Sequence, residues 1–247
     1  MNSDPARVLI LGHTDYIRAR SYAPELLTDS QLQVFTVPPR PADQQDPLFQ
    51  RLHYRLDPGT LLVRNIWRPG EYVEATVAYE ELSLQKFNLV ASVCQRLGAT
   101  RLEVTEIQEL AEDGRQTGAA RLSVLAGRGS VSFSNDTTGK LARRLEARWK
   151  WPGGPVDDAG AVELTSRTGL SADQIVMGLI DQRRYQGNRL SEHRLELDLT
   201  AEARREVKAA VEVQSFAGKL GPSFAADLTL LKKQSSTIRL VLDVGFL

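Results

Sequence analysis

Two stretches of the chain share one pattern of apolar and polar positions: an amphipathic helix, a glycine and then a strand. In residues 83–98 and again in residues 171–187, apolar side chains recur three and four positions apart and the stretch ends in glycine. Each stretch leads into a strand that reads Arg-Leu-Glu-aliphatic, beginning at Arg101 and at Arg194. The shared pattern predicts two helix-on-sheet layers and suggests an internal duplication.

The second of these helices has the clearer start. Ser171 is suited to the N-cap, and Gln174, three residues later, completes a capping box with it. Leu170 before the cap and Ile175 after it form a hydrophobic staple. These four residues predict that the helix begins at Ser171.

Alternation of apolar and polar residues predicts strands over much of the remaining chain. The most regular example runs from Ile238 to Phe246, where every second residue is apolar. Residues 207–216 fit both a strand and a helix, and we favour the strand. The other predicted strands are 7–11, 32–37, 61–66, 72–79, 102–107, 122–133, 145–151, 193–199 and 224–231.

These elements predict an α+β fold, in which a curved, mostly antiparallel sheet carries two principal amphipathic helices. The segment 38–47 is rich in Pro, Asp and Gln, so we expect it to be an exposed connection. Residues 1–247 are interpreted as one domain. Its expected parts are N-terminal strands and the connection at 1–59, then two similar halves at 60–151 and 160–247, separated by a Pro/Gly loop at 152–160.

The amino-acid composition indicates which partners and which cellular compartment to expect for the protein. Among 247 residues, 31 Lys and Arg balance 31 Asp and Glu, so the chain has no net field that would attract nucleic acid. Cys94 is the only cysteine, which excludes an internal disulfide and a zinc site built from cysteines. The apolar run 8–11 is too short for a signal peptide or a membrane span. We expect a cytoplasmic protein that binds no nucleic acid.

His13 and Asp15 are the residues that most resemble a catalytic or metal-binding pair. They directly follow the first predicted strand, and imidazole and carboxylate groups can together hold a divalent metal. A hydrolytic metal needs at least one more ligand, and neither His53 nor His193 has ligand-like neighbours. The chain also lacks the motifs of phosphate loops, dinucleotide loops and nucleophile elbows. We therefore predict no cofactor and favour a polar loop at His13.

Trp149 and Trp151 alternate with Arg148 and Lys150 on a predicted strand. Aromatic rings between basic residues can stack on a ligand or cover a lipid headgroup. The same alternation is typical of a half-buried strand, which we favour.

The sequence is compatible with three classes of function. The leading hypothesis is a non-enzymatic protein-interaction or assembly module, which would bind a protein partner or oligomerise, because the candidate motifs indicate structure and not chemistry. The second is a pore-forming protein that inserts long amphipathic β-hairpins into membranes, since several predicted ribbons approach the length of a membrane-crossing strand. The third is a metal-dependent hydrolase that uses His13 and Asp15.

Overall fold

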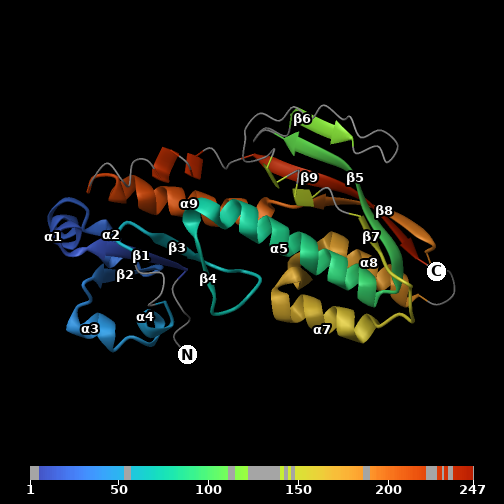
Figure 1. The fold of residues 1–247 in the computed structure, drawn as a ribbon, viewed down its shortest axis with the longest axis horizontal. Helices are drawn as coiled ribbons and strands as arrows, with labels where there is room; N and C mark the ends of the chain where they lie inside the picture. The colour runs from blue at the N-terminus through green and yellow to red at the C-terminus, as the bar shows by residue number, and fades with distance from the viewer. Residues whose placement is uncertain are drawn as a thin grey trace. The chain divides into compact units, whose positions relative to one another are not determined.

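The structure is a computed structural model that describes residues 6–52, 57–110, 115–121, 140–141, 144–145, 148–185, 190–220, 227–229, 231–232 and 236–246 (Figure 1). It confirms the α+β class, with 51% helix, 27% strand and a strongly curled antiparallel half-barrel sheet. The chain forms two compact units, which we describe separately. Unit 1 comprises Met1–Asn65, Pro69–Tyr79 and Ala203–Ser235, and unit 2 comprises Ile66–Arg68, Glu80–Glu202 and Ser236–Leu247.

Unit 1 is built on a four-stranded sheet of order β2-β1-β3-β4. Its strands are β1 (Arg7–Gly12), β2 (Leu32–Val37), β3 (Leu61–Arg64) and β4 (Tyr72–Glu74). β1 and β2 run parallel, whereas β3 is antiparallel to both β1 and β4. The continuous apolar run of β1 suits a strand that is covered on both faces, and Val8, Leu9, Ile10 and Leu11 are all fully buried.

Short helices complete the N-terminal part of unit 1. They are α1 (His13–Tyr22), α2 (Glu25–Thr28), α3 (Pro41–Gln44) and α4 (Pro47–Leu52). The segment 38–47 is mostly exposed, as expected, but it is not irregular throughout, because α3 lies within it and the side chain of Asp43 is only 3% exposed. The pairing of Asp43 with Arg40 orders this segment despite its polar composition.

Unit 2 contains the curled sheet, of order β6-β5-β9-β8, with β7 also paired to β5. Its strands are β5 (Ala99–Leu110), β6 (Gln116–Arg121), β7 (Arg148–Lys150), β8 (Glu192–Asp198) and β9 (Thr237–Phe246). Every pairing is antiparallel. The register shifts along β5 at Ala99/Arg101 and again at Val104/Glu106, and such bulges bend a strand and increase its twist.

Both predicted helix-strand segments are present in unit 2. α5 (Ala75–Arg96), of which the first five residues belong to unit 1, leads into β5, and α8 (Gln174–Arg184) precedes β8. Gly98 between α5 and β5 has a φ of +80°, the left-handed conformation that glycine readily adopts after a helix. β5 and β8 flank β9 on either side (Figure 1). The internal duplication, and with it the division into two similar halves, stays a prediction.

The alternation of β9 places its apolar residues on the buried face of this sheet. Leu242 is fully buried and lies in register with Val104 of β5 and Leu195 of β8. Phe87 of α5 contacts Trp149 of β7, with ring centroids 4.8 Å apart, so α5 covers this same face. The opposite face carries most of the charged residues of the three strands, among them the half-buried Asp243. Glu109 of β5 is an exception, since it is fully buried and in register with Ile238.

Several predicted strands are wholly or partly helical, and two of them overlap long helices. Residues 207–216 lie in α9 (Ala201–Ala217), whose side chains at Val207, Ala210 and Val213 are buried at helical spacing. The strand predicted at 72–79 ends at Glu74, where α5 begins. In both places the apolar residues fit either period, and helical packing decides between them.

Three further boundaries differ from the prediction. Ser171 lies in a 3-10 turn, Leu170–Ala172, and the N-cap of α8 is Asp173, whose carboxylate accepts the N–H groups of Ile175 and Val176. The loop expected to last until residue 160 ends earlier, because α7 (Asp158–Thr168) begins there, capped by Asp157. Of the strand predicted at 145–151, the described residues form β7, whereas Leu145 is helical. The structure describes helix at 227–229, within the strand predicted at 224–231, whereas the strand predicted at 122–133 lies outside the described residues.

Candidate functional site

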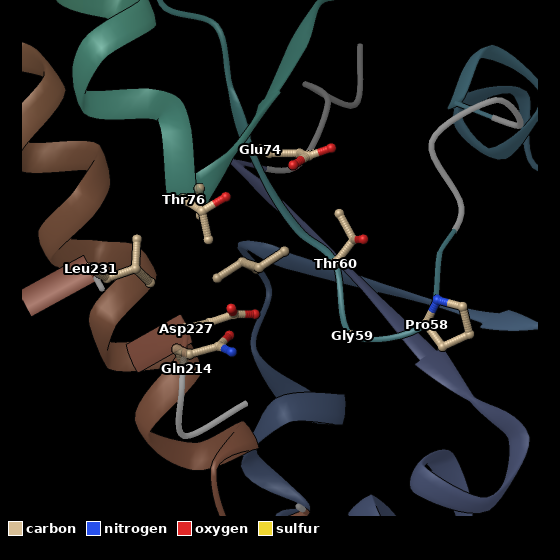
Figure 2. A pocket seen from close by; sticks show the side chains of 10 residues that line it. Pro58, Gly59, Thr60, Glu74, Thr76, Gln214, Asp227 and Leu231 are labelled. Atoms are coloured by element: carbon tan, nitrogen blue, oxygen red, sulfur yellow. The ribbon is translucent and has the colours of Figure 1, made fainter. Parts of the chain in front are cut away.

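A polar cavity of about 260 Å³ opens in unit 1. The residues that line it belong to the turn before β3, the junction of β4 with α5, α9 and the helical residues beyond α9. Figure 2 shows the side chains of Gln214 and Asp227 on one side of the cavity and that of Thr60 on the other. The lining residues are Pro58, Gly59, Thr60, Leu61, Glu74, Ala75, Thr76, Gln214, Asp227 and Leu231.

The described residues that line the cavity offer acceptor oxygens and include no cationic side chain. Burial raises the pKa of the Asp227 carboxyl above its ordinary range. Glu74 lies at the exposed rim, whereas Gln214 is fully buried. This lining suits a small molecule with hydrogen-bond donors better than an anion, because an anion would face carboxylate oxygens.

We predict that Asp227→Asn raises the unfolding midpoint at neutral pH. With a folded-state pKa above the unfolded value of about 3.9, the unfolded carboxyl ionises first, so stability falls as pH rises between the two pKa values. Because asparagine does not ionise, the Asp227→Asn variant should not lose stability in this pH range. Urea denaturation should show a higher midpoint for Asp227→Asn than for the parent protein at pH 7. This difference between the two midpoints should decline toward about pH 4. Glu74→Gln at the exposed rim should leave the midpoint unchanged, and an Asp227→Asn variant less stable at pH 7 would show that the carboxylate is favourably bonded.

The sheet of unit 1 has an edge strand, β2, and side chains bond to two of its outward backbone groups. The guanidinium of Arg40 donates to the carbonyl of Val34 over 3.0 Å, and the carboxylate of Asp43 accepts the N–H of Thr36 over 3.1 Å. Burial alone would raise the pKa of Asp43, but hydrogen bonds from Arg40 and from the Thr36 backbone lower it overall. A charged pair thus blocks this edge against another strand.

The sheet of unit 2 ends at β8, and among the described strands β8 pairs with β9 alone. Two bonds fix which of its backbone groups face β9: Phe246 N–H donates to the Ser191 carbonyl, and Leu199 N–H donates to the Ile238 carbonyl. The register between them is unbroken, so the odd-numbered residues of β8 bond to β9. The N–H and C=O groups of the even-numbered residues therefore point outward.

Three consecutive outward positions of β8 carry exposed charged side chains: Glu192, Arg194 and Glu196. Glu192 lies 3.4 Å from Arg101, which reaches it across Gly245, and Glu196 lies 3.6 Å from Arg239. These are ion pairs within one face of the sheet. No described side chain accepts from or donates to the backbone of these three residues as Arg40 and Asp43 do on β2.

At the C-terminal end of this edge, a buried cation is bonded to the backbone of β8. The ammonium group of Lys86 on α5 donates to the carbonyl of Asp198, the last residue of β8, over 2.7 Å. It also pairs with Asp173 over 2.9 Å and with Glu202 over 3.0 Å. Because Asp173 caps α8 and Asp198 accepts the N–H groups of Thr200 and Ala201 at the start of α9, Lys86 holds two helix starts against the end of β8.

His13 and Asp15 lie in the first turn of α1 and not in a loop. His13 is exposed, and Asp15 is 3.8 Å from Arg18 in an i,i+3 pair. Within the described ranges, no three His, Cys, Asp or Glu side chains gather closely enough to hold a metal. A metal role for this pair stays a prediction, which metal analysis of the purified protein would test.

The predicted aromatic site lies on β7 of unit 2. The rings of Trp149 and Trp151 are parallel, with centroids 6.5 Å apart, and both side chains are half-buried. Trp149 packs on Phe87 of α5, as the core interpretation expects. Lys150, which lies between the two tryptophans in the sequence, is exposed. Arg148 is the backbone partner of Glu103 in the pairing of β7 with β5.

The sequence did not reveal the cavity, the Lys86 cluster or the open edge of β8. The cavity and the cluster each join segments more than a hundred positions apart, such as Lys86 and Glu202. The order Glu192, Arg194, Glu196 is visible in the sequence, but only the sheet order shows that β8 is an edge.

No family model, curated protein or solved structure matches this chain. The described helices include none with the length and apolar character needed to cross a membrane.

Proposed function

We propose that the protein is a non-catalytic assembly module that binds an extended protein segment along the open edge of β8. Such a segment would add a strand to the curled sheet, with main-chain hydrogen bonds supplying the affinity. The observation that carries the proposal is the outward direction of the backbone groups at Glu192, Arg194 and Glu196.

The contrast between the two edge strands supports this role. On β2, side chains bond to the outward carbonyl of Val34 and the outward N–H of Thr36, whereas on β8 the described side chains bond to an outward group only at Asp198. Charged side chains along an edge discourage unselective pairing, but they permit a partner whose charges are complementary. β8 is thus suited to a selective partner.

The proposal includes the compartment and the type of partner. Cys94 is fully buried on α5, and burial raises the pKa of its thiol to about 12, so it remains an inert thiol at neutral pH. A single buried thiol fits the reducing cytoplasm. Balanced charge favours a protein partner or a second copy over nucleic acid.

Photo-crosslinking in the cell tests the role of the edge. A photo-reactive amino acid placed at Glu196 should give a discrete protein adduct, whereas one at Tyr22, an exposed residue of unit 1, should not. Arg194→Pro should abolish the adduct, because proline removes an outward N–H while sparing the bonds to β9. Its thermal midpoint should remain close to that of the parent protein.

Leu195→Pro is the matched control, since it removes an N–H that faces β9 and should therefore destabilise the sheet. An adduct at Glu196 that persists in a folded Arg194→Pro variant would contradict strand addition at β8.

Membrane insertion is a second candidate, which the length of the central strands favours. β5 has 12 residues and β9 has 10, and a tilted membrane-crossing strand needs about 9–11. If amphipathic hairpins insert, the protein should release dye from liposomes. If the liposomes stay intact at all protein concentrations, membrane insertion is excluded and the assembly proposal remains.

A further inference from the structure

The order of charges along β8 determines the register in which a second copy of β8 can pair with its edge. Reading outward positions only, the strand presents Glu192, Arg194 and Glu196, which are acidic, basic and acidic. Residues directly opposite in an antiparallel pair have their side chains on the same face, so like charges there oppose pairing and unlike charges favour it. A second copy of β8 can therefore be tested register by register.

The register centred on Arg194 is excluded by charge. It places Arg194 of one copy opposite Arg194 of the other, and Glu192 opposite Glu196 on both sides. Every pair among Glu192, Arg194 and Glu196 in this register is a like-charge pair.

The register centred on Leu195 is only partly compatible. It places Arg194 opposite Glu196 twice, which is favourable. It also places Glu192 opposite Asp198, two acidic residues, and the carbonyl of Asp198 is already bonded to Lys86.

The register centred on His193 contains no like-charge pair. Glu192 of each copy lies opposite Arg194 of the other, and Glu196 lies opposite the apolar Leu190. The carbonyl of Leu190, like that of Asp198, is already bonded to a side chain, here Arg183, so the two central pairs supply the hydrogen bonds of this register and charge distinguishes it from the register centred on Leu195. Each Glu192–Arg194 pair exchanges two backbone hydrogen bonds, because both residues have outward N–H and C=O groups. We infer that the chain self-associates through antiparallel β8 edges in this register, related by a two-fold axis at His193.

This inference rests on the proposed function and specifies its partner as a second copy of the chain. A contact made by one short strand is smaller than a stable interface, so we expect a reversible, concentration-dependent dimer. Its symmetry makes the interface isologous, and one substitution therefore changes both charge pairs at once.

Charge reversal tests the register directly by sedimentation equilibrium. Arg194→Glu creates two Glu–Glu pairs and Glu192→Arg creates two Arg–Arg pairs, so each variant alone should dimerise at least about tenfold more weakly than the parent protein. An equimolar mixture of the two variants should form a heterodimer, because each acidic position then faces a basic one. The double variant Glu192→Arg/Arg194→Glu should recover the homodimer for the same reason.

Glu196→Arg is the matched control, since its counterpart in this register is Leu190. It should leave dimerisation nearly unchanged, whereas a strong loss would favour the register centred on Leu195 and overturn ours. Failure of the mixture to restore association would also overturn it.

The same measurements separate this inference from the proposed function. Wild-type protein that stays monomeric at about 1 mM overturns self-association. If the photo-crosslink at Glu196 still captures a different protein and is lost in Arg194→Pro, the assembly role at β8 stands with another partner. If both experiments fail, the edge has no recognition role.

Discussion

Replacement of Lys86 by methionine should lower the free energy of unfolding by about 3–5 kcal/mol, the usual cost of removing one partner from a buried ion pair. The side chain of Lys86 is 2% exposed, and its loss would leave the carboxylates of Asp173 and Glu202 without their cation. It would also leave the Asp198 carbonyl without the bond that Lys86 donates. Guanidinium denaturation measures the effect.

Two variants separate charge burial from loss of packing. Lys86→Met combined with Asp173→Asn and Glu202→Gln should recover part of the lost stability, because no uncompensated carboxylate remains. Lys219→Ala removes an exposed pair with Glu25 and should leave the midpoint nearly unchanged. An unchanged midpoint in Lys86→Met would show that solvent, and not Lys86, compensates these carboxylates.

Leu242→Asp should unfold the protein or make it insoluble. Leu242 is fully buried in the middle of β9, between Val104 and Leu195, and an unpaired carboxylate there costs several kcal/mol. Expression, solubility and circular dichroism measure the outcome.

The adjacent residue provides the control. Asp243 is half-buried on the opposite, charged face, where its neighbours in register are Glu103 and Arg194. Asp243→Asn should have little effect on stability, because successive side chains of a strand point to opposite faces. A folded, soluble Leu242→Asp variant would contradict the burial of this face, and one that had also lost membrane activity would favour the insertion hypothesis.

Strands were predictable where the apolar residues fit the two-residue period of a strand and do not fit the period of a helix. β9 is the clearest case, and the predicted strand at 193–199 agrees with β8 within one residue at each end. α9 was missed because its apolar residues fall at every second position as well as at helical spacing, as Val207, Val211 and Val213 show. A single sequence cannot decide between two periods that both bury apolar surface.

Caps and functional groups were less predictable than strands. Ser171 and Asp173 are both good N-cap residues, and Lys86 provides a second interaction for Asp173 that local sequence does not reveal. The segment at 38–47 has the composition of a disordered loop, yet the Arg40–Asp43 pair orders it. The cavity, the Lys86 cluster and the open edge depend on tertiary neighbours, so only the fold reveals them.

Residue-resolved amide hydrogen exchange across β8 tests most directly whether its edge is open for recognition. In dilute, monomeric protein, the amides of Leu195 and Leu197 should be protected by their bonds to β9, whereas those of Arg194 and Glu196 should exchange rapidly. At concentrations where the dimer forms, Arg194 should become protected. Slow exchange of Arg194 and Glu196 in the monomer would mean that another part of the chain already covers this edge, and would contradict the assembly role of β8.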